Sequence, residues 1–216
     1  MIGILEQFTE EHLTEYQINN YPYPLKWNNN LGIGYLHSAG YDYGEEYWGK
    51  CRGFLTDLGT QLSIARSDFV KKNISTFDNL CDVGIGSGQF VEMTNCKGYN
   101  VNTFAKEWLN EHGKYADVYT VTFDALSFWD VLEHIDNPTE LLIKTNNIFV
   151  SIPVYKDVYS CLSSKHLRPG EHIWHFTDIG IKNFMSYYGF DCKDSSNFET
   201  DLGREDIRTY YFSKVK

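Results

Sequence analysis

The sequence predicts an α/β protein built on a doubly wound, mostly parallel sheet of seven strands that ends in an antiparallel hairpin. Short apolar runs alternate with helical patterns from residue 76 to the C-terminus, which requires right-handed crossovers and helices on both faces of the sheet. The segment NLCDVGIGSGQFVEM (79–93) places one acid and three alternate glycines where the first run meets the first helix. The last two runs, 190–194 and 207–214, are separated only by a loop, so we expect them to pair antiparallel.

The individual elements follow from the same patterns in chain order. Apolar runs bounded by turn residues predict strands, and amphipathic segments predict helices. Gly113 is expected to end the second helix of the domain and Thr177 to cap the last one. We expect strands at 79–83, 99–103, 116–120, 124–128, 148–152, 190–194 and 207–214, and helices at 88–95, 104–112, 138–145 and 178–188.

The first 75 residues differ in character from the rest. Residues 1–48 hold seven of the 16 tyrosines together with Trp27 and Trp48, spaced among Asn, Gly and Pro. From Glu45 to Asn73 the pattern becomes helical, with a break expected at Gly59. We therefore predict an aromatic-rich helical and loop cap at 1–75, which acts as a lid on a main domain at 76–216.

Composition and charge indicate a folded protein and argue against nucleic-acid and membrane partners. The 216 residues are 42% hydrophobic and 22% charged, which predicts a folded core rather than disorder. The net charge of −10 would repel phosphate backbones, and no basic cluster offsets it, which argues against a nucleic-acid partner. The five cysteines are scattered, and the N-terminal segment MIGILEQFTEEHLTEYQ fits neither a signal peptide nor a membrane span. We expect a cytoplasmic protein without a membrane partner, and the oligomeric state stays open.

The acid and the glycines of the first turn predict the kind of ligand. Glycines at a strand-to-helix turn let a ligand approach the backbone closely. The dinucleotide fingerprint GxGxxG fails because its third glycine would fall on Gln89, and a pyrophosphate would be repelled by Asp82. Asp82, Gly84, Gly86 and Gly88 instead form DxGxGxG, which resembles motif I of class I S-adenosylmethionine (SAM)-dependent methyltransferases. The alternative is a tight turn that binds no ligand.

Two further segments extend the resemblance over residues 79–214. FDALSFWDVLEHIDNP (123–138) is similar to the fourth-strand segment of the methyltransferase subfamily that includes the ubiquinone-biosynthesis O-methyltransferases. SIPVY (151–155) and HIWHFTDIGIKNFMSYYGF (172–190) are similar to its fifth strand and the helix that follows. The resemblance implies a Rossmann-like methyltransferase fold, SAM as the cofactor and transfer of a methyl group.

The resemblance also implies cofactor-binding positions. In the family an acid at the end of the second strand holds the ribose, but this chain has Asn100 there, with Asn102 as the alternative. Asparagine can accept and donate hydrogen bonds but lacks the charge that strengthens them. A simple turn role for this asparagine remains the other interpretation. The further positions implied near the cofactor are Val101, Asp117, Trp129 and Asp130, with a core aromatic as the alternative role of Trp129. Tyr47 is included from the aromatic lid because aromatic faces can stabilise a sulfonium; the alternative for the lid residues is a cluster that packs on the surface.

Methyl transfer depends mainly on alignment of donor and acceptor, and a base assists when the acceptor is a hydroxyl or ring nitrogen. The candidate bases are His134, His172 and His175, all in predicted loops at strand ends. A bracing role is the alternative for His134. The spacing of His166, His172 and His175 with Glu171 matches no compact metal site, so we expect no metal.

These observations favour a SAM-dependent methyltransferase that acts on a hydroxyl, a nitrogen or a similar nucleophile of a small-molecule acceptor. One alternative is a binding module that keeps the fold without transfer activity, which Asn100 encourages. A second alternative is a nucleotide-dependent oxidoreductase, against which the GxGxG spacing and Asp82 argue.

Overall fold

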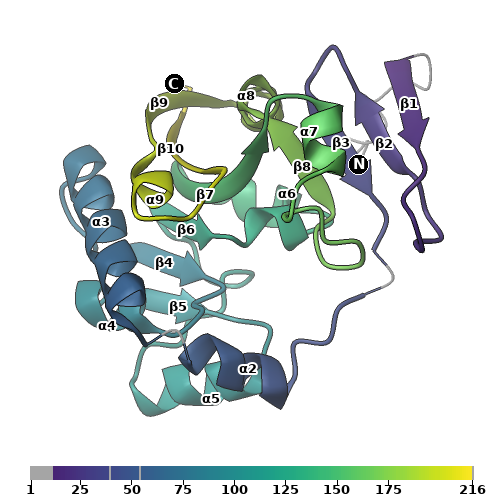
Figure 1. The fold of residues 1–216 in the computed structure, drawn as a ribbon. Helices are drawn as coiled ribbons and strands as arrows, with labels where there is room; N and C mark the ends of the chain where they lie inside the picture. The colour runs from purple at the N-terminus through teal and green to yellow at the C-terminus, as the bar shows by residue number, and fades with distance from the viewer. Residues whose placement is uncertain (1–11, 39, 54, 216) are drawn as a thin grey trace.

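The computed structural model describes residues 12–38, 40–53 and 55–215 (Figure 1). Most of the N-terminal segment on which the absence of a signal peptide was predicted, residues 1–11, lies outside the described residues. No described helix combines the length and the apolar character needed to cross a membrane.

The central strands form the predicted parallel sheet. β5, β4, β6 and β7 lie side by side and parallel, β10 pairs antiparallel with β7, and β9 pairs antiparallel with β10 (Figure 1). The bounds are β4 (Leu80–Val83), β5 (Lys97–Tyr99), β6 (Ala125–Trp129), β7 (Asn147–Tyr155), β9 (Phe190–Ser196) and β10 (Ile207–Lys214). The α/β class, the parallel centre and the final antiparallel hairpin are thus confirmed.

The described residues form ten strands rather than seven. The strand predicted at 99–103 is displaced, because β5 overlaps it only at Tyr99 and α5 begins at Thr103. The strand predicted at 116–120 is wrong: Gly98 and Tyr115 form only an isolated bridge, and turns follow. Asp117 explains this, because its carboxylate accepts the amide of Tyr119 and its carbonyl accepts the amides of Thr120 and Val121. These local bonds use the groups that a strand would give to a neighbour.

Four strands were not predicted. β1 (Leu13–Tyr16), β2 (Leu25–Asn28) and β3 (Ile33–Leu36) form an antiparallel meander, and β3 pairs with β8 (Trp174–Thr177). β8 also runs parallel to the end of β7, where Val154 is opposite Phe176, so the meander extends the sheet (Figure 1). Each of these strands has four residues, and β3 joins a partner about 140 positions away, which a local pattern does not reveal.

The helices differ from the predictions mainly at their ends. The predicted helical stretch from Glu45 consists of α2 (Glu45–Arg52) and α3 (Asp57–Asn73). The break therefore lies before Asp57, whereas Gly59 is in the first turn of α3, where its amide donates to the capping Thr56 side chain at 3.2 Å. Thr177 caps α8 as predicted, accepting from Gly180 at 3.0 Å. The other helices are α4 (Gln89–Thr94), α5 (Thr103–Glu111), α6 (Thr139–Leu142), α7 (Val158–Leu162), α8 (Asp178–Tyr187) and α9 (Phe198–Asp201).

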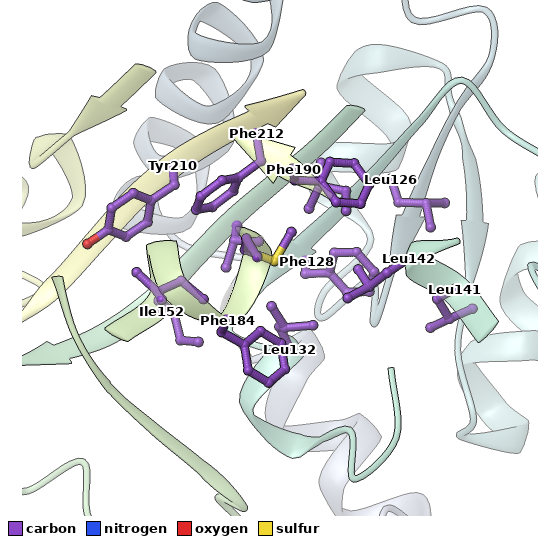
Figure 2. Close-up of a cluster of buried hydrophobic side chains, with 14 of the residues drawn as sticks. Leu126, Phe128, Leu132, Leu141, Leu142, Ile152, Phe184, Phe190, Tyr210 and Phe212 are labelled. Atoms are coloured by element: carbon purple, nitrogen blue, oxygen red, sulfur yellow. The ribbon is translucent and has the colours of Figure 1, made fainter. Parts of the chain in front are cut away.

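Buried side chains cover both faces of the central sheet. On one face, Phe128 of β6 and Ile152 of β7 pack with Phe184 of α8 and with Phe212 of β10 (Figure 2). On the other face, side chains of α3, α4 and α5 pack on β4 and β7, with Phe69 edge-on to Phe149. This is the doubly wound arrangement. α3 belongs to the second of these layers although it lies within residues 1–75, so the boundary at residue 75 stays a prediction.

Candidate functional site

The predicted glycine turn lies at the carboxyl end of β4 and uses left-handed backbone angles. Gly84, Gly86 and Gly88 have φ values of 75°, 52° and 84°, which favour glycine. A Cβ atom at Gly84 would lie 2.4 Å from the Val131 side chain, and one at Gly88 would lie 2.7 Å from Trp108. A Cβ at Gly86 would have nothing within 4 Å. Gly84 and Gly88 therefore allow close packing, whereas Gly86 is the open side of the turn.

Asp82 lies beneath this turn rather than on its surface. Its side chain is buried, and Oδ1 accepts a hydrogen bond of 2.6 Å from the hydroxyl of Ser127 on β6. Burial raises the pKa of Asp82 to about 7, although the Ser127 hydrogen bond and the charge of Arg66 partly oppose this shift. A nearby cation would favour the charged carboxylate.

Asn100 and Asn102 follow β5 on the other side of the glycine turn. Asn102 is buried, and both polar groups of its side chain form hydrogen bonds. Oδ1 caps α5 by accepting from Ala105 at 3.0 Å, and Nδ2 donates to the carbonyls of Tyr43 and Gly44. Asn100 uses Oδ1 for the Asn102 amide at 2.9 Å. Of the two asparagines, Asn100 is therefore the one that retains amide hydrogens for a ligand within the described structure.

Two other predicted cofactor contacts follow the same strand. The side chain of Val101 is 69% exposed, so it presents an apolar surface at this edge. Asp117 comes after the isolated bridge, and its Oδ1 closes a local turn by accepting the Tyr119 amide at 2.9 Å. Their roles toward an adenosine group remain predictions.

Trp129 is the last residue of β6 and Asp130 follows it, and because β6 pairs with β4 both lie next to the glycine turn. Trp129 is buried, its Nε1 has no hydrogen-bond partner among the described residues, and the Arg66 guanidinium lies 5.1 Å from its ring centre. Arg204 binds both oxygens of Asp130, at 2.7 and 2.9 Å, and Arg66 reaches it at 3.4 Å. Both arginines also bind the fully buried carboxylate of Glu199.

This network fixes the charge of Asp130. Burial alone would raise its pKa, but the charge and hydrogen bonds of Arg204 outweigh burial and hold the pKa below the ordinary value. Arg66, Glu199 and Arg204 were missed by the sequence reasoning. They come from α3, α9 and the loop after α9, and no local motif connects these segments.

The aromatic segment 41–48, before and within α2, contacts residues that follow β5 and residues that follow β6. The ring centres of Tyr43 and Tyr47 are 5.0 Å apart, as are those of Tyr41 and Tyr43. The Tyr43 hydroxyl is 3.2 Å from Nδ1 of His134, while its backbone carbonyl accepts from Asn102. Burial raises the pKa of Tyr43 and of Tyr47, so both hydroxyls stay protonated.

Beside this segment is a cleft of about 280 Å³. His134 is on its wall, and Tyr35 and Asp136 are joined there by a hydrogen bond of 3.3 Å. The remaining lining residues come from the segment after β3 and from the loop before β8: His37, Ser38, Gly40, Tyr41, Tyr43, Gly170, Glu171 and Ile173. This cleft is the candidate acceptor site.

The structure brings the three predicted histidines together. The ring centres of His134 and His172 are 4.6 Å apart, and those of His172 and His175 are 6.3 Å apart. Burial lowers the pKa of all three, that of His175 to about 4, because the charged rings would lose their hydration. His166 lies apart from them, with Nε2 3.0 Å from the Glu205 carbonyl.

Glu133 joins this group, although the sequence reasoning considered only the histidine of its LEH motif. Its side chain is 1% exposed, and neither oxygen has a hydrogen-bond partner of normal geometry within the described residues. Burial and the nearby charge of Asp130 raise its pKa. One donor atom each from Glu133, His134 and His172 lies within 4.8 Å of the others.

No protein-family model and no curated protein matches the chain, whereas solved structures do match it. Magnesium protoporphyrin IX methyltransferase from Synechocystis PCC 6803, solved with bound SAH, is 12% identical with a TM-score of 0.57, over 80% of this chain and 96% of that one. A SAM-dependent methyltransferase from Clostridium acetobutylicum ATCC 824 is 13% identical with a TM-score of 0.52, over 79% and 97%.

A third match is the glycopeptide N-methyltransferase MtfA complexed with sinefungin, 8% identical with a TM-score of 0.51, over 71% of this chain and 87% of that one. At such identities the likeness shows the fold alone. The chain has the Rossmann-like fold of SAM-dependent methyltransferases, as the resemblance predicted. The comparisons do not distinguish the ubiquinone-biosynthesis type among them.

Proposed function

We propose that the protein is a SAM-dependent methyltransferase whose acceptor is a small molecule with a hydroxyl, a nitrogen or a similar nucleophile. The observation that carries the proposal is the open face of Gly86 at the carboxyl end of β4, in a fold whose solved examples include methyltransferases with bound SAM or SAH. Ligands of open parallel sheets bind at this end of the strands.

The residues at this end fit the cofactor. The backbone around Gly86 accommodates a ligand at close approach, and Asn100 offers amide hydrogens to ribose hydroxyls. Asp82 supplies a carboxylate that a cation would stabilise, and the indole N–H of Trp129 has no partner within the described structure. When bound, SAM supplies a methyl group that passes to the acceptor's lone pair as its bond to sulfur breaks.

The remaining parts of the site serve the acceptor. The cleft beside His134 holds it, and the tyrosines at 41, 43 and 47 exclude water from the space between cleft and glycine turn. His134 lines the cleft and is neutral at pH 7 because burial lowers its pKa, so it can accept a proton from an acceptor hydroxyl. His172 and His175 are buried behind it, outside the lining of the cleft, and burial lowers their pKa values so strongly that they are weak bases. Much of the rate then comes from alignment of the two reactants.

Calorimetry with SAM, SAH and NADH tests the proposal. We expect SAM and SAH to bind in the micromolar range, about −8 kcal/mol, and NADH not to bind. Absence of binding of SAM and SAH at millimolar concentration would overturn the methyltransferase proposal, and tight binding of NADH would instead favour the oxidoreductase.

A second measurement separates an enzyme from a silent binding module. The module is favoured by Asn100 in place of the usual acid and by the occupation of the Asp130 carboxylate by Arg204. Release of SAH is to be screened over phenols, amines, sugars and nucleosides. SAM binding without turnover on any acceptor class would favour the module; turnover on one class identifies the acceptor chemistry.

A further inference from the structure

The carboxylate of Glu133 is buried without an ion-pair partner among the described residues. The side chain is 1% exposed, and both oxygens lack a hydrogen-bond partner among the described residues. A buried carboxylate is costly unless a cation or several donors compensate it. No described lysine or arginine forms an ion pair with Glu133, whereas Asp130 and Glu199 nearby in the fold have two arginines.

The two histidines beside Glu133 present the atoms that a metal ion needs. Nδ1 of His134 is 3.1 Å from the carbonyl oxygen of Glu171. A carbonyl only accepts, so this bond requires the proton on Nδ1, with the Tyr43 hydroxyl at 3.2 Å as a second acceptor, and that tautomer leaves Nε2 with a free lone pair. A ligand histidine that donates its other ring N–H to a backbone carbonyl is the usual arrangement in metal sites.

The backbone holds these side chains in place before any ligand binds. The amide of Ile173 donates to the carbonyl of Glu133 at 2.8 Å, which joins the segment of Glu133 and His134 to the segment of His172. The indole of Trp174 donates to the carbonyl of Ile135 at 2.9 Å, a short distance further along each segment. The two segments therefore cannot separate without loss of both bonds.

We infer that Glu133, His134 and His172 form a binding site for one divalent first-row transition-metal ion, such as Mn²⁺, Co²⁺ or Zn²⁺. Their donor atoms lie within 4.8 Å of one another. Two ligands at about 2.1 Å from one ion lie at most about 4.2 Å apart, so a small side-chain adjustment closes the site. This set differs from His166, His172, His175 and Glu171, whose spacing in the sequence predicted no metal site.

The ligand set defines the chemistry of the ion. Two imidazoles and one carboxylate suit Zn²⁺, Mn²⁺, Fe²⁺ and Co²⁺, while Mg²⁺ prefers oxygen ligands. Three protein ligands leave positions open, and His134 lines the 280 Å³ cleft, so those positions are reached from the candidate acceptor site. An oxygen of a small molecule in the cleft can then bind the ion directly.

Metal binding by the untagged, full-length protein tests this inference without reference to methyl transfer. After removal of metals with a chelator, Mn²⁺ is titrated by calorimetry and by electron paramagnetic resonance; Mn²⁺ is preferred because the free cysteines favour softer ions. We expect one equivalent to bind in the micromolar range or tighter, and Co²⁺ to give the visible spectrum of a protein-bound ion. Mg²⁺ should bind far more weakly.

Matched variants locate the ion. Glu133→Gln keeps the shape and removes the charge, and His172→Gln removes one imidazole; each should weaken Mn²⁺ binding at least about 100-fold. His166→Gln, which changes a histidine outside the group, should leave it unchanged. Circular dichroism checks that each variant is folded. If His172→Gln does not fold, the Mn²⁺ affinity of Glu133→Gln by itself decides whether the ion binds at this site. No Mn²⁺ or Co²⁺ binding to the folded protein, or binding that persists in Glu133→Gln, would overturn the inference.

Discussion

Arg204 binds Asp130 through both terminal nitrogens of its guanidinium, at 2.7 and 2.9 Å, while the Asp130 backbone is left-handed with φ of 57°. A non-glycine residue in this conformation is uncommon and tends to occur where surrounding contacts determine it. Here the contact is the ion pair, which fixes the chain at the end of β6, directly beside the glycine turn. Arg204 therefore links the hairpin side of the sheet to the candidate cofactor site.

The first prediction concerns the stability that this network provides. Arg204→Met removes one of two cations that neutralise Asp130 and the fully buried Glu199. Loss of one partner of a buried ion network costs about 3 kcal/mol, because the remaining charge stays buried. Urea unfolding should show a decrease of that order in the free energy of unfolding.

Lys165→Met is the control for this change. The ion pair of Lys165 with Glu205 is exposed, at 60% and 75% of the side-chain surfaces, so its loss should cost less than about 1 kcal/mol. An equal effect of the two substitutions would show that the Arg204 network does not stabilise the fold.

The second prediction separates the backbone role of Gly86 from its role toward a ligand. Gly86→Val should lose about 1–2 kcal/mol of stability because φ is 52°, and should weaken SAM binding more than tenfold because the side chain enters the open face of the turn. Thermal unfolding and calorimetry with SAM measure the two effects.

Gly113→Val is the matched control, since Gly113 has φ of 63° and a Cβ atom there would also have nothing within 4 Å. Gly113 follows the end of α5, away from the turn, so this variant should lose similar stability while keeping SAM affinity. A Gly86→Val protein that folds and binds SAM as tightly as the Gly113→Val protein would remove Gly86 from the cofactor site.

The third prediction concerns the pH dependence of stability. The pKa of Asp82 is about 7 in the folded chain, whereas its ordinary value is 3.8. Between pH 3.8 and about pH 7 the folded state therefore keeps a proton on Asp82 that the unfolded state has released. Stability from this group is full below about pH 4 and is lost as the pH rises through about 7, by at most about 4 kcal/mol.

Asp82→Asn tests this sign, because the amide cannot ionise. Relative to the variant, the wild type should lose free energy of unfolding between about pH 4 and about pH 7, measured by urea unfolding at each pH without cofactor. A wild type that gains stability relative to Asp82→Asn over this interval would contradict the assignment.

Sequence reasoning reached the parts of the molecule that depend on near neighbours. The glycine turn was predictable because left-handed backbone angles at Gly84, Gly86 and Gly88 leave a local pattern. The hairpin of β9 and β10 was predictable because its strands are consecutive. The strand predicted at 116–120 failed for an equally local reason, namely that the Asp117 side chain turns the chain.

The parts that could not be predicted depend on residues far apart in the chain. β3 finds its partner β8 about 140 positions away, and four-residue strands carry little periodicity of their own. Arg66 and Glu199 are 133 positions apart, and Glu133 meets His172 through pairing of segments distant in the chain, such as the bond between Glu133 and Ile173. Charged residues at such distances leave no pattern in the sequence that distinguishes a buried pair from two exposed side chains.

The last prediction decides which asparagine after β5 meets the ribose. Asn100→Asp should keep SAM affinity or raise it about fivefold, because a charged acceptor forms stronger hydrogen bonds with ribose hydroxyls. Asn102→Asp should instead destabilise the chain, since Nδ2 of Asn102 donates to the Gly44 carbonyl at 2.9 Å and a carboxylate there would face a carbonyl oxygen without a proton between them. Calorimetry with SAM and urea unfolding of both variants give the two readouts. A large loss of SAM affinity in Asn100→Asp, with the fold intact, would show that Asn100 does not occupy the ribose position and that the alignment of this strand with the family is wrong.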